Sequence, residues 1–185
     1  VPNLLGQERL TPSFPWSEVE KELGGQGRQK FNLAQLAIDR HCQNGLGDKP
    51  ALLWEGKDGQ RETYTFDQLR LLTNKFAHVL SGLGAQKGDR VFIFAGRVPG
   101  LYVAVFGTLK YGAVIGPLFS AFGPDPVRQR LLDSGAKVLI TTPELKARIA
   151  GILKDLPQLQ HAIIIGRDAQ GAGLEKGDIS YEQVM

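Results

Sequence analysis

The sequence predicts an α/β fold, in which helices flank a largely parallel sheet that follows an irregular N-terminal arm and a β-hairpin. Two observations support this prediction. Short β-branched apolar runs recur about every 24 residues, and segments with apolar residues at helical spacing lie between them. Because strand, helix and strand alternate, right-handed crossovers and parallel pairing are expected. The runs predicted as strands are 90–95, 113–118, 137–142 and 162–166.

The elements before the first of these strands are of three kinds. Residues 1–30 are rich in Gly, Pro and Gln and are expected to form the irregular arm, with Phe14 and Trp16 as possible anchors. A weaker helical pattern covers 32–42, and 51–66 is a hairpin candidate with Asp58-Gly59 in its turn. We therefore expect an arm over 1–30 and an α/β subdomain over 31–185, truncated at its C-terminal end.

A helix is predicted directly after the hairpin. Thr65 is its expected N-cap, Gln68 completes a capping box, and Gly82 or Gly84 ends it. Its apolar stripe packs on the sheet and consists of Leu69, Leu72, Phe76 and Leu80.

Residues 100–122 contain one charged side chain, Lys110, and are long enough to cross a bilayer. Glycines at 107, 112 and 116, with Pro117, interrupt the run. These interruptions favour a helix followed by a strand inside a soluble sheet rather than one membrane span.

The final residues, "DISYEQVM", begin another helix, with Ser180 as N-cap and Glu182 and Gln183 behind it. The chain stops before two turns are complete, and it starts without Met or a secretory signal. We expect it to be part of a longer protein.

Composition restricts the possible partners. The 185 residues are 42% hydrophobic, and the net charge of +3 arises from 22 basic and 19 acidic residues that are interspersed. No basic stripe suited to nucleic acid stands out. A single cysteine, Cys42, with three histidines supports neither an internal disulfide nor a closed zinc site, and suits a reducing cytoplasm.

Local motifs point to structure more than to chemistry. "FAGRVPG" lies where a phosphate-binding loop would precede a helix, but it lacks both G-x-G-x-x-G and G-x-x-x-x-G-K-S/T. Its glycines therefore indicate a tight turn. Asp89 in "KGDR" is expected to cap a turn, and the scattered histidines are expected to be packing or surface residues. Lys146 and Arg148 follow the carboxyl end of a strand, where open sheets bind ligands, although the residues alone favour a solvated cationic helix face.

Residues 63–145 resemble the opening segment of the AMP-forming, adenylate-forming enzymes, which include acyl-CoA synthetases, luciferases and adenylation domains. The shared pattern comprises "TYTFDQL", "LGAQKGDRV", a helix ending in "GAV" and "LLDSGAKVLIT", in that order. Within this superfamily, "FNLAQLAIDRHCQNGLGDKPALLWEG" is similar to the N-terminal signature of acetyl-CoA synthetases.

The resemblance implies an AMP-forming ligase that joins acetate and CoA at the expense of ATP, with Mg²⁺ stabilising the charge that develops at the α-phosphate. The family's phosphate loop, adenine and ribose segments and catalytic lysine normally lie downstream of the part matched here. The resemblance therefore assigns this chain no catalytic residue and no metal ligand. We expect no tight binding of ATP to this part alone.

One ligand site follows from the resemblance. In acetyl-CoA synthetases, cations after the strand matching "KVLITT" lie near the CoA 3′-phosphate, and a Phe-Gly-Gly-Phe-like loop lies near the CoA. This implies CoA-binding roles for Lys146, Arg148 and Phe119. Here "FSAF" replaces the glycine loop, and the cations lack the family's Arg-x-x-Arg spacing.

The partners implied are acetate or another carboxylate, ATP and CoA, without nucleic acid or membrane. The isolated chain is expected to self-associate through apolar surface. Two alternatives remain open: a ligase of the same superfamily for medium-chain or aromatic acids, and a non-catalytic scaffold or binding module.

Overall fold

The computed structural model describes residues 15–23, 31–166, 174–175 and 177–185. Contacts divide the chain into two units, Val1–Phe31 and Asn32–Met185. In the first unit the described residues form one short helix, α1 (Trp16–Glu22), so the arm that was predicted to be irregular contains a helix of seven residues. Trp16 is 72% exposed, and Phe14 lies outside the described residues.

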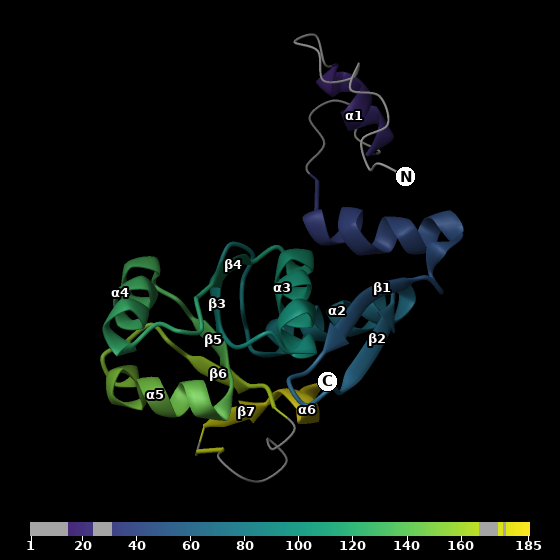
Figure 1. Ribbon diagram of the computed structural model, residues 1–185. Coiled ribbons are helices and arrows are strands. Elements are labelled where there is room, and N and C mark those ends of the chain that lie inside the picture. Colours follow the sequence, from purple (N-terminus) through teal and green to yellow (C-terminus); the bar gives the residue numbers. More distant parts are fainter. Residues whose placement is uncertain (1–14, 24–30, 167–173, 176) are drawn as a thin grey trace. The chain divides into compact units, whose positions relative to one another are not determined.

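The second unit is built on a five-stranded sheet in which every neighbouring pair is parallel (Figure 1). The strand order is β4-β3-β5-β6-β7, so β3 lies between the two strands that follow it in sequence. The strands are β3 (Arg90–Phe94), β4 (Val114–Pro117), β5 (Val138–Thr141), β6 (His161–Ile164) and β7 (Asp178–Ser180). The predicted α/β class and the parallel sheet are confirmed.

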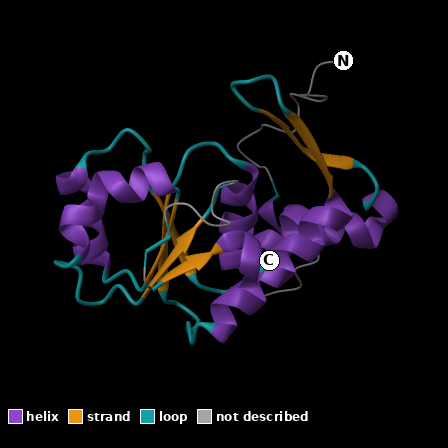
Figure 2. Ribbon diagram, turned by 90° about the horizontal axis from the view of Figure 1, so that it is seen from below, coloured by secondary structure: helices purple, strands orange, loops and turns teal. Residues whose placement is uncertain are grey.

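Helices cover both faces of this sheet, as Figures 1 and 2 show from two directions. On one face lie α2 (Phe66–Gly82) and α3 (Pro99–Tyr111), and on the other lie α4 (Pro124–Ser134) and α5 (Pro143–Leu153). Alternation along the strands supplies both cores. Val91 and Ile93 of β3 pack on the first face, whereas Phe94 packs on the second.

Helix α2 begins as the sequence predicts. The Thr65 hydroxyl accepts a hydrogen bond from the Gln68 amide (3.2 Å), and the Gln68 side chain accepts one from the Thr65 amide (2.8 Å). Leu69, Phe76 and Leu80 of the predicted stripe are buried. The confirmed capping box fixes where the hairpin ends and the first helical layer starts.

Residues 100–122 fold as the predicted helix and strand. Helix α3 ends at Gly112, whose φ of 87° lies in the left-handed region that glycine tolerates, and β4 starts two residues later. Gly107 allows α3 to approach α2, because a Cβ there would lie 2.7 Å from the Cβ of Phe76. Within the described residues no helix has the length and apolar character of a membrane span.

The predicted hairpin is also present, and it contacts the sheet domain. Strands β1 (Pro50–Glu55) and β2 (Arg61–Thr65) pair antiparallel, with Gly59 at a φ of 73° in the turn. The Trp54 indole donates a hydrogen bond to the carbonyl of Arg97 (2.6 Å), in the connection between β3 and α3. The preceding helical pattern contains two π-helical segments, η2 (Gln35–Asp39) and η3 (Cys42–Leu46).

The C-terminal end differs from the prediction in one element. Ser180 is the N-cap of α6 (Tyr181–Val184), and its hydroxyl accepts from the Gln183 amide at 3.3 Å, as expected. The three residues Asp178–Ser180, however, form β7, which pairs with β6 and was not predicted. A three-residue run that begins with a charged side chain carries too little alternation to be recognised as a strand.

Candidate functional site

The carboxyl edge of the sheet is where the fold gathers helix starts and polar loops. Helices α3, α4 and α5 are each the next element after a strand, and each has proline in its first turn. In open parallel sheets this edge is the usual place for ligands. All three residues singled out by the sequence, Phe119, Lys146 and Arg148, lie in the connections or the first two helical turns that follow these strands.

Phe119 lies in the connection between β4 and α4, where it is 66% exposed. Its carbonyl accepts a hydrogen bond from the Phe122 amide (2.9 Å), which closes a tight turn. The two rings meet edge to face with centroids 5.7 Å apart. Phe122 is partly buried against the core under α4 and α5, so the turn presents one aromatic ring to solvent and anchors the other.

Arg148, in the second turn of α5, contacts this same connection. Its Nη1 donates a hydrogen bond to the Ser120 carbonyl at 2.7 Å, although the two residues are 28 positions apart. Its Nη2 lies 3.4 Å from a Glu144 carboxylate oxygen one turn earlier. The structure therefore brings Phe119 and Arg148 together through the turn at Ser120.

Lys146 faces a different neighbour. Its ammonium group donates to the carboxylates of Glu175 (2.5 Å) and Asp178 (2.8 Å), and the residue is only 6% exposed. Asp178 is the first residue of β7, and its side chain is 5% exposed. Lys146 thus joins α5 to the edge strand of the sheet.

Electrostatics keep Lys146 charged in this position. Burial works against the charged form, but the hydrogen bonds and negative charges of Asp178 and Glu175 outweigh it and raise the pKa of Lys146 above its ordinary value. Asp178 also accepts from the backbone amide of Glu175 (2.8 Å), so the two acidic residues support each other's placement.

Residues that the sequence did not single out complete the carboxyl edge. The Arg130 guanidinium lies over the Phe122 ring, with 4.5 Å between the guanidinium carbon and the ring centroid. Ser120 contributes its main-chain carbonyl, which no residue-type pattern marks as functional. The partners of Lys146 are 29 and 32 residues away, and the second of them, Asp178, belongs to the strand that was not predicted.

The other candidates take the structural roles expected of them. His41 packs against Phe66 with ring centroids 4.5 Å apart, and the His161 ring nitrogen lies 3.1 Å from the Leu83 carbonyl. Asp89 accepts from the amide of Gln86, three residues earlier, and so caps the turn before β3. Among the described residues no group of three His, Cys, Asp or Glu side chains is arranged to hold a metal ion.

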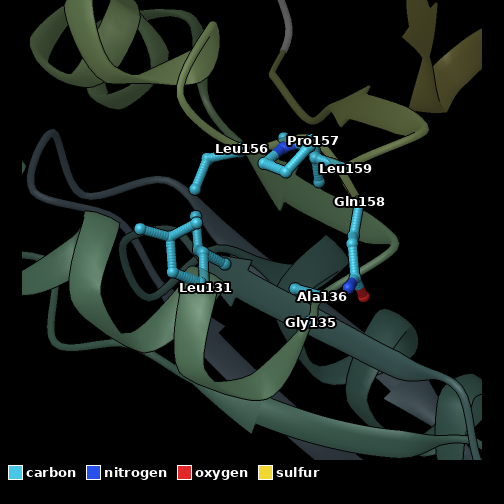
Figure 3. A pocket seen from close by; sticks show the side chains of 8 residues that line it. Leu131, Gly135, Ala136, Leu156, Pro157, Gln158 and Leu159 are labelled. Atoms are coloured by element: carbon cyan, nitrogen blue, oxygen red, sulfur yellow. The ribbon is translucent and has the colours of Figure 1, made fainter.

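Among the described residues, hollows also lie away from the carboxyl edge. A cavity of about 50 Å³ lies at the amino ends of β5 and β6 and is lined largely by leucines (Figure 3). A polar pocket of about 370 Å³ contains Cys42, Asp67 and Arg70. An apolar groove of about 460 Å³ runs along α2 and is lined by Tyr64, Gln68, Leu71, Leu72, Asn74, Lys75 and His78.

Comparison with known proteins decides which family these features belong to. The family described as AMP-binding enzyme matches residues 38–183, which is most of the chain. This chain belongs to the AMP-binding enzyme family. The resemblance inferred from "LGAQKGDRV" and "LLDSGAKVLIT" is thereby confirmed.

Relatives in the AMP-binding enzyme family include acetyl-coenzyme A synthetases. The chain is 43% identical over 170 residues to the enzyme of Bacillus subtilis, a match that covers 91% of this chain and 29% of the relative. It is 34% identical over 168 residues to that of Rubrobacter xylanophilus, with 84% and 26% covered. A 3-hydroxypropionyl-coenzyme A synthetase of Sulfurisphaera tokodaii is 30% identical over 202 residues, with 97% and 30% covered. The chain spans less than a third of the length of each.

Two solved structures share this fold. An acyl-CoA synthetase of Brucella canis superposes with a TM-score of 0.84 at 26% identity, covering 98% of this chain and 32% of that one. An anthranilate CoA ligase crystallised with anthranoyl-AMP gives a TM-score of 0.73 at 25% identity, with 83% and 27% covered. The five-stranded sheet and its helices therefore have the same architecture as the matching parts of these two proteins.

Proposed function

We propose that this chain is part of an AMP-forming acetyl-CoA synthetase. The observation that carries the proposal is the 43% identity to a synthetase of that name over nearly the whole chain. In the proposed reaction, the acetate carboxylate attacks the α-phosphate of ATP, acetyl-AMP forms and pyrophosphate leaves. The CoA thiol then attacks the acetyl carbon and AMP leaves.

In this proposal the chain contributes framework and a coenzyme-facing edge rather than catalytic groups. The residues that hold Mg²⁺ and stabilise the charge at the α-phosphate are expected in parts of the synthetase that this chain does not span. Phe119 and Arg148 are proposed to lie near CoA, because they meet at the carboxyl edge of the sheet. The geometry of Lys146 favours a structural role for it, since its charge is already shared by two carboxylates.

The proposal also includes which carboxylic acid is activated. Acetyl-coenzyme A synthetases recur among the similar proteins, which favours acetate. A second candidate is a ligase for another small or an aromatic acid, favoured by the likeness to a 3-hydroxypropionyl-coenzyme A synthetase and to an anthranilate CoA ligase. A non-catalytic binding module remains the third.

The test uses the intact protein that contains this chain. Purified protein is assayed for carboxylate-dependent ATP–pyrophosphate exchange with acetate, 3-hydroxypropionate, hexanoate and anthranilate, and then for CoA-dependent release of AMP. A kcat/KM for acetate at least tenfold above the other acids is expected. A preference for another acid would support the second candidate, and exchange with none of them would support a binding module.

A further inference from the structure

The connection between β4 and α4 carries an aromatic loop, which we define as Phe119–Phe122. Phe119 is mostly exposed, while Phe122 is partly buried. The loop is bonded internally through the Phe122 amide and the Phe119 carbonyl (2.9 Å), and at its start the Leu118 amide donates to the Ile93 carbonyl of β3 (2.8 Å). Its beginning is therefore fixed to the sheet, whereas its tip depends on contacts from the helices.

Two arginines from different helices supply those contacts. Arg148 of α5 donates to the Ser120 carbonyl at the tip of the aromatic loop (2.7 Å). Arg130 of α4 stacks over Phe122 at 4.5 Å and also donates to the Pro126 carbonyl of its own helix (2.9 Å). The aromatic loop is thus held from one side by a hydrogen bond and from another by a cation–π contact.

The surroundings of Arg148 favour a role toward the protein rather than toward a phosphate. One guanidinium nitrogen is committed to Ser120, and another lies 3.4 Å from the Glu144 carboxylate, whose side chain is 84% exposed. A phosphate approaching this guanidinium would meet that carboxylate charge as well. A hydrogen bond to a main-chain carbonyl instead uses the planar fork of arginine to fix a backbone position.

We propose that Arg148 is a positioning residue for the coenzyme step: it holds the aromatic loop so that the exposed Phe119 ring is presented at the carboxyl edge, and it acts on CoA through this loop. The inference rests on the proposed function for its ligand. Arg130 supports the same loop from α4, so loss of either arginine affects binding of the whole coenzyme and not of its 3′-phosphate in particular.

The test compares Arg148→Met, Arg148→Lys and Arg130→Met in the intact synthetase, with Arg128→Met as the matched control. Arg128 lies on the same helix as Arg130 and is also a surface arginine, but it pairs with Asp155 (3.5 Å), away from the loop. KM and kcat are measured with CoA and with dephospho-CoA. Acetate-dependent ATP–pyrophosphate exchange, which needs no CoA, is measured alongside.

Arg148→Met is expected to raise the KM about tenfold for CoA and for dephospho-CoA alike, the size of effect expected for one hydrogen bond to a charged donor. Exchange is expected to stay within twofold of the parent. Arg148→Lys, which keeps a donor, should recover part of the loss, and Arg130→Met should raise both KM values together. Arg128→Met should change neither.

Hydrogen exchange of the amides at 119–122 gives a readout independent of activity. Faster exchange at these amides in Arg148→Met, but not in Arg128→Met, is the expected result. Unchanged loop exchange, unchanged KM values or a loss confined to CoA would overturn the inference, the last because it indicates a direct phosphate contact. If the parent protein uses no CoA while the loop still loosens, the proposed function and the coenzyme part of the inference both fail, and the loop-holding role alone stands.

Discussion

Lys146 holds a buried positive charge between two carboxylates, and this determines how the residue contributes. Its partner Asp178 is as buried as Lys146 itself, whereas Glu175 is 71% exposed and therefore contributes less. Removing one member of a buried pair leaves the other charge without compensation. The residue was predicted from sequence to lie near a phosphate, but its contacts favour a clamp between α5 and β7.

We expect Lys146→Met to lower the free energy of unfolding by about 3 kcal/mol, because Asp178 then keeps a buried and uncompensated charge. Lys154→Met, a substitution of an exposed lysine that immediately follows the same helix, should change it by less than about 0.5 kcal/mol. Urea unfolding followed by circular dichroism measures both. Equal stability of the two variants would contradict the clamp.

Asp89 links the turn before β3 to β5 and makes stability depend on pH. The Gln86 amide (2.8 Å) and then the Lys137 ammonium (2.9 Å) hold the pKa of its carboxyl below the ordinary 3.8. A lowered carboxyl pKa contributes stability that is present above the unfolded value and is lost as the pH falls through the folded one.

The expected result is a loss of stability of the parent below about pH 4 that is smaller in Asp89→Asn, since the amide cannot titrate. At pH 7 the variant should be less stable by about 1–3 kcal/mol, because a charged acceptor has been removed. Melting temperatures between pH 3 and 7 test this. If the melting temperatures of parent and variant fall by the same amount between pH 7 and pH 3, Asp89 does not contribute to the loss of stability in acid.

At the scale of elements, substitutions at two glycines in the α2–α3 layer distinguish the effect of packing on stability from the effect of helix propensity. A Cβ at Gly107 would lie 2.7 Å from the Phe76 Cβ and 3.0 Å from the Thr73 carbonyl oxygen, whereas a Cβ at Gly82 would meet nothing within 4 Å. Gly107→Ala should therefore destabilise the protein by about 1–3 kcal/mol through overpacking. Gly82→Ala should be neutral or stabilising by up to about 1 kcal/mol.

Chemical denaturation of the two alanine variants provides the comparison, since both add one methyl group to a helix in the same layer. An equal change in the free energy of unfolding of both variants would mean that α2 and α3 can move apart without a loss of stability. That outcome would contradict the close approach of the two helices at Gly107.

Elements with strong local signals could be predicted, and elements defined by distant partners could not. The four apolar runs became β3, β4, β5 and β6, and the capping box at Thr65 set the start of α2. Strand β7 was missed because it is short and becomes a strand only by pairing with β6. The π-helical segments between 35 and 46 were missed because the spacing of residues does not reveal which carbonyl each amide selects.

The same distinction applies to the candidate site. Residue type and position placed Arg148 at the carboxyl edge, which follows from strand direction alone, whereas Phe119 was implied only by the family resemblance. What these side chains contact was not predictable, because Arg148 bonds a main-chain carbonyl 28 residues away and Lys146 bonds a strand that was not recognised. The partners of a side chain, and hence its role, required the tertiary structure.

For the whole molecule, we expect this chain alone to show no acetate-dependent ATP–pyrophosphate exchange, although the intact protein should show it. Alignment of the carboxylate with the α-phosphate and stabilisation of the developing charge each lower the activation free energy, by on the order of several kcal/mol. The chain covers 29% of the Bacillus subtilis synthetase, and the family's motifs for both tasks are expected in the remainder. Exchange above background from purified residues 1–185 would contradict this.

The apolar groove along α2 suggests how the isolated chain behaves in solution. Leu71 in this groove is 54% exposed, and Lys75 at its rim donates a hydrogen bond to the Met185 carbonyl (2.9 Å). Exposed apolar surface of this kind favours association.

We expect a second copy of the chain to cover the groove, giving a sedimentation coefficient that rises with concentration. Leu71→Glu should weaken this association because it places a charge in the contact. Arg61→Glu, an exposed change on the hairpin, should leave it unaltered. A concentration-independent monomer that binds no hydrophobic dye would show that the groove drives no association.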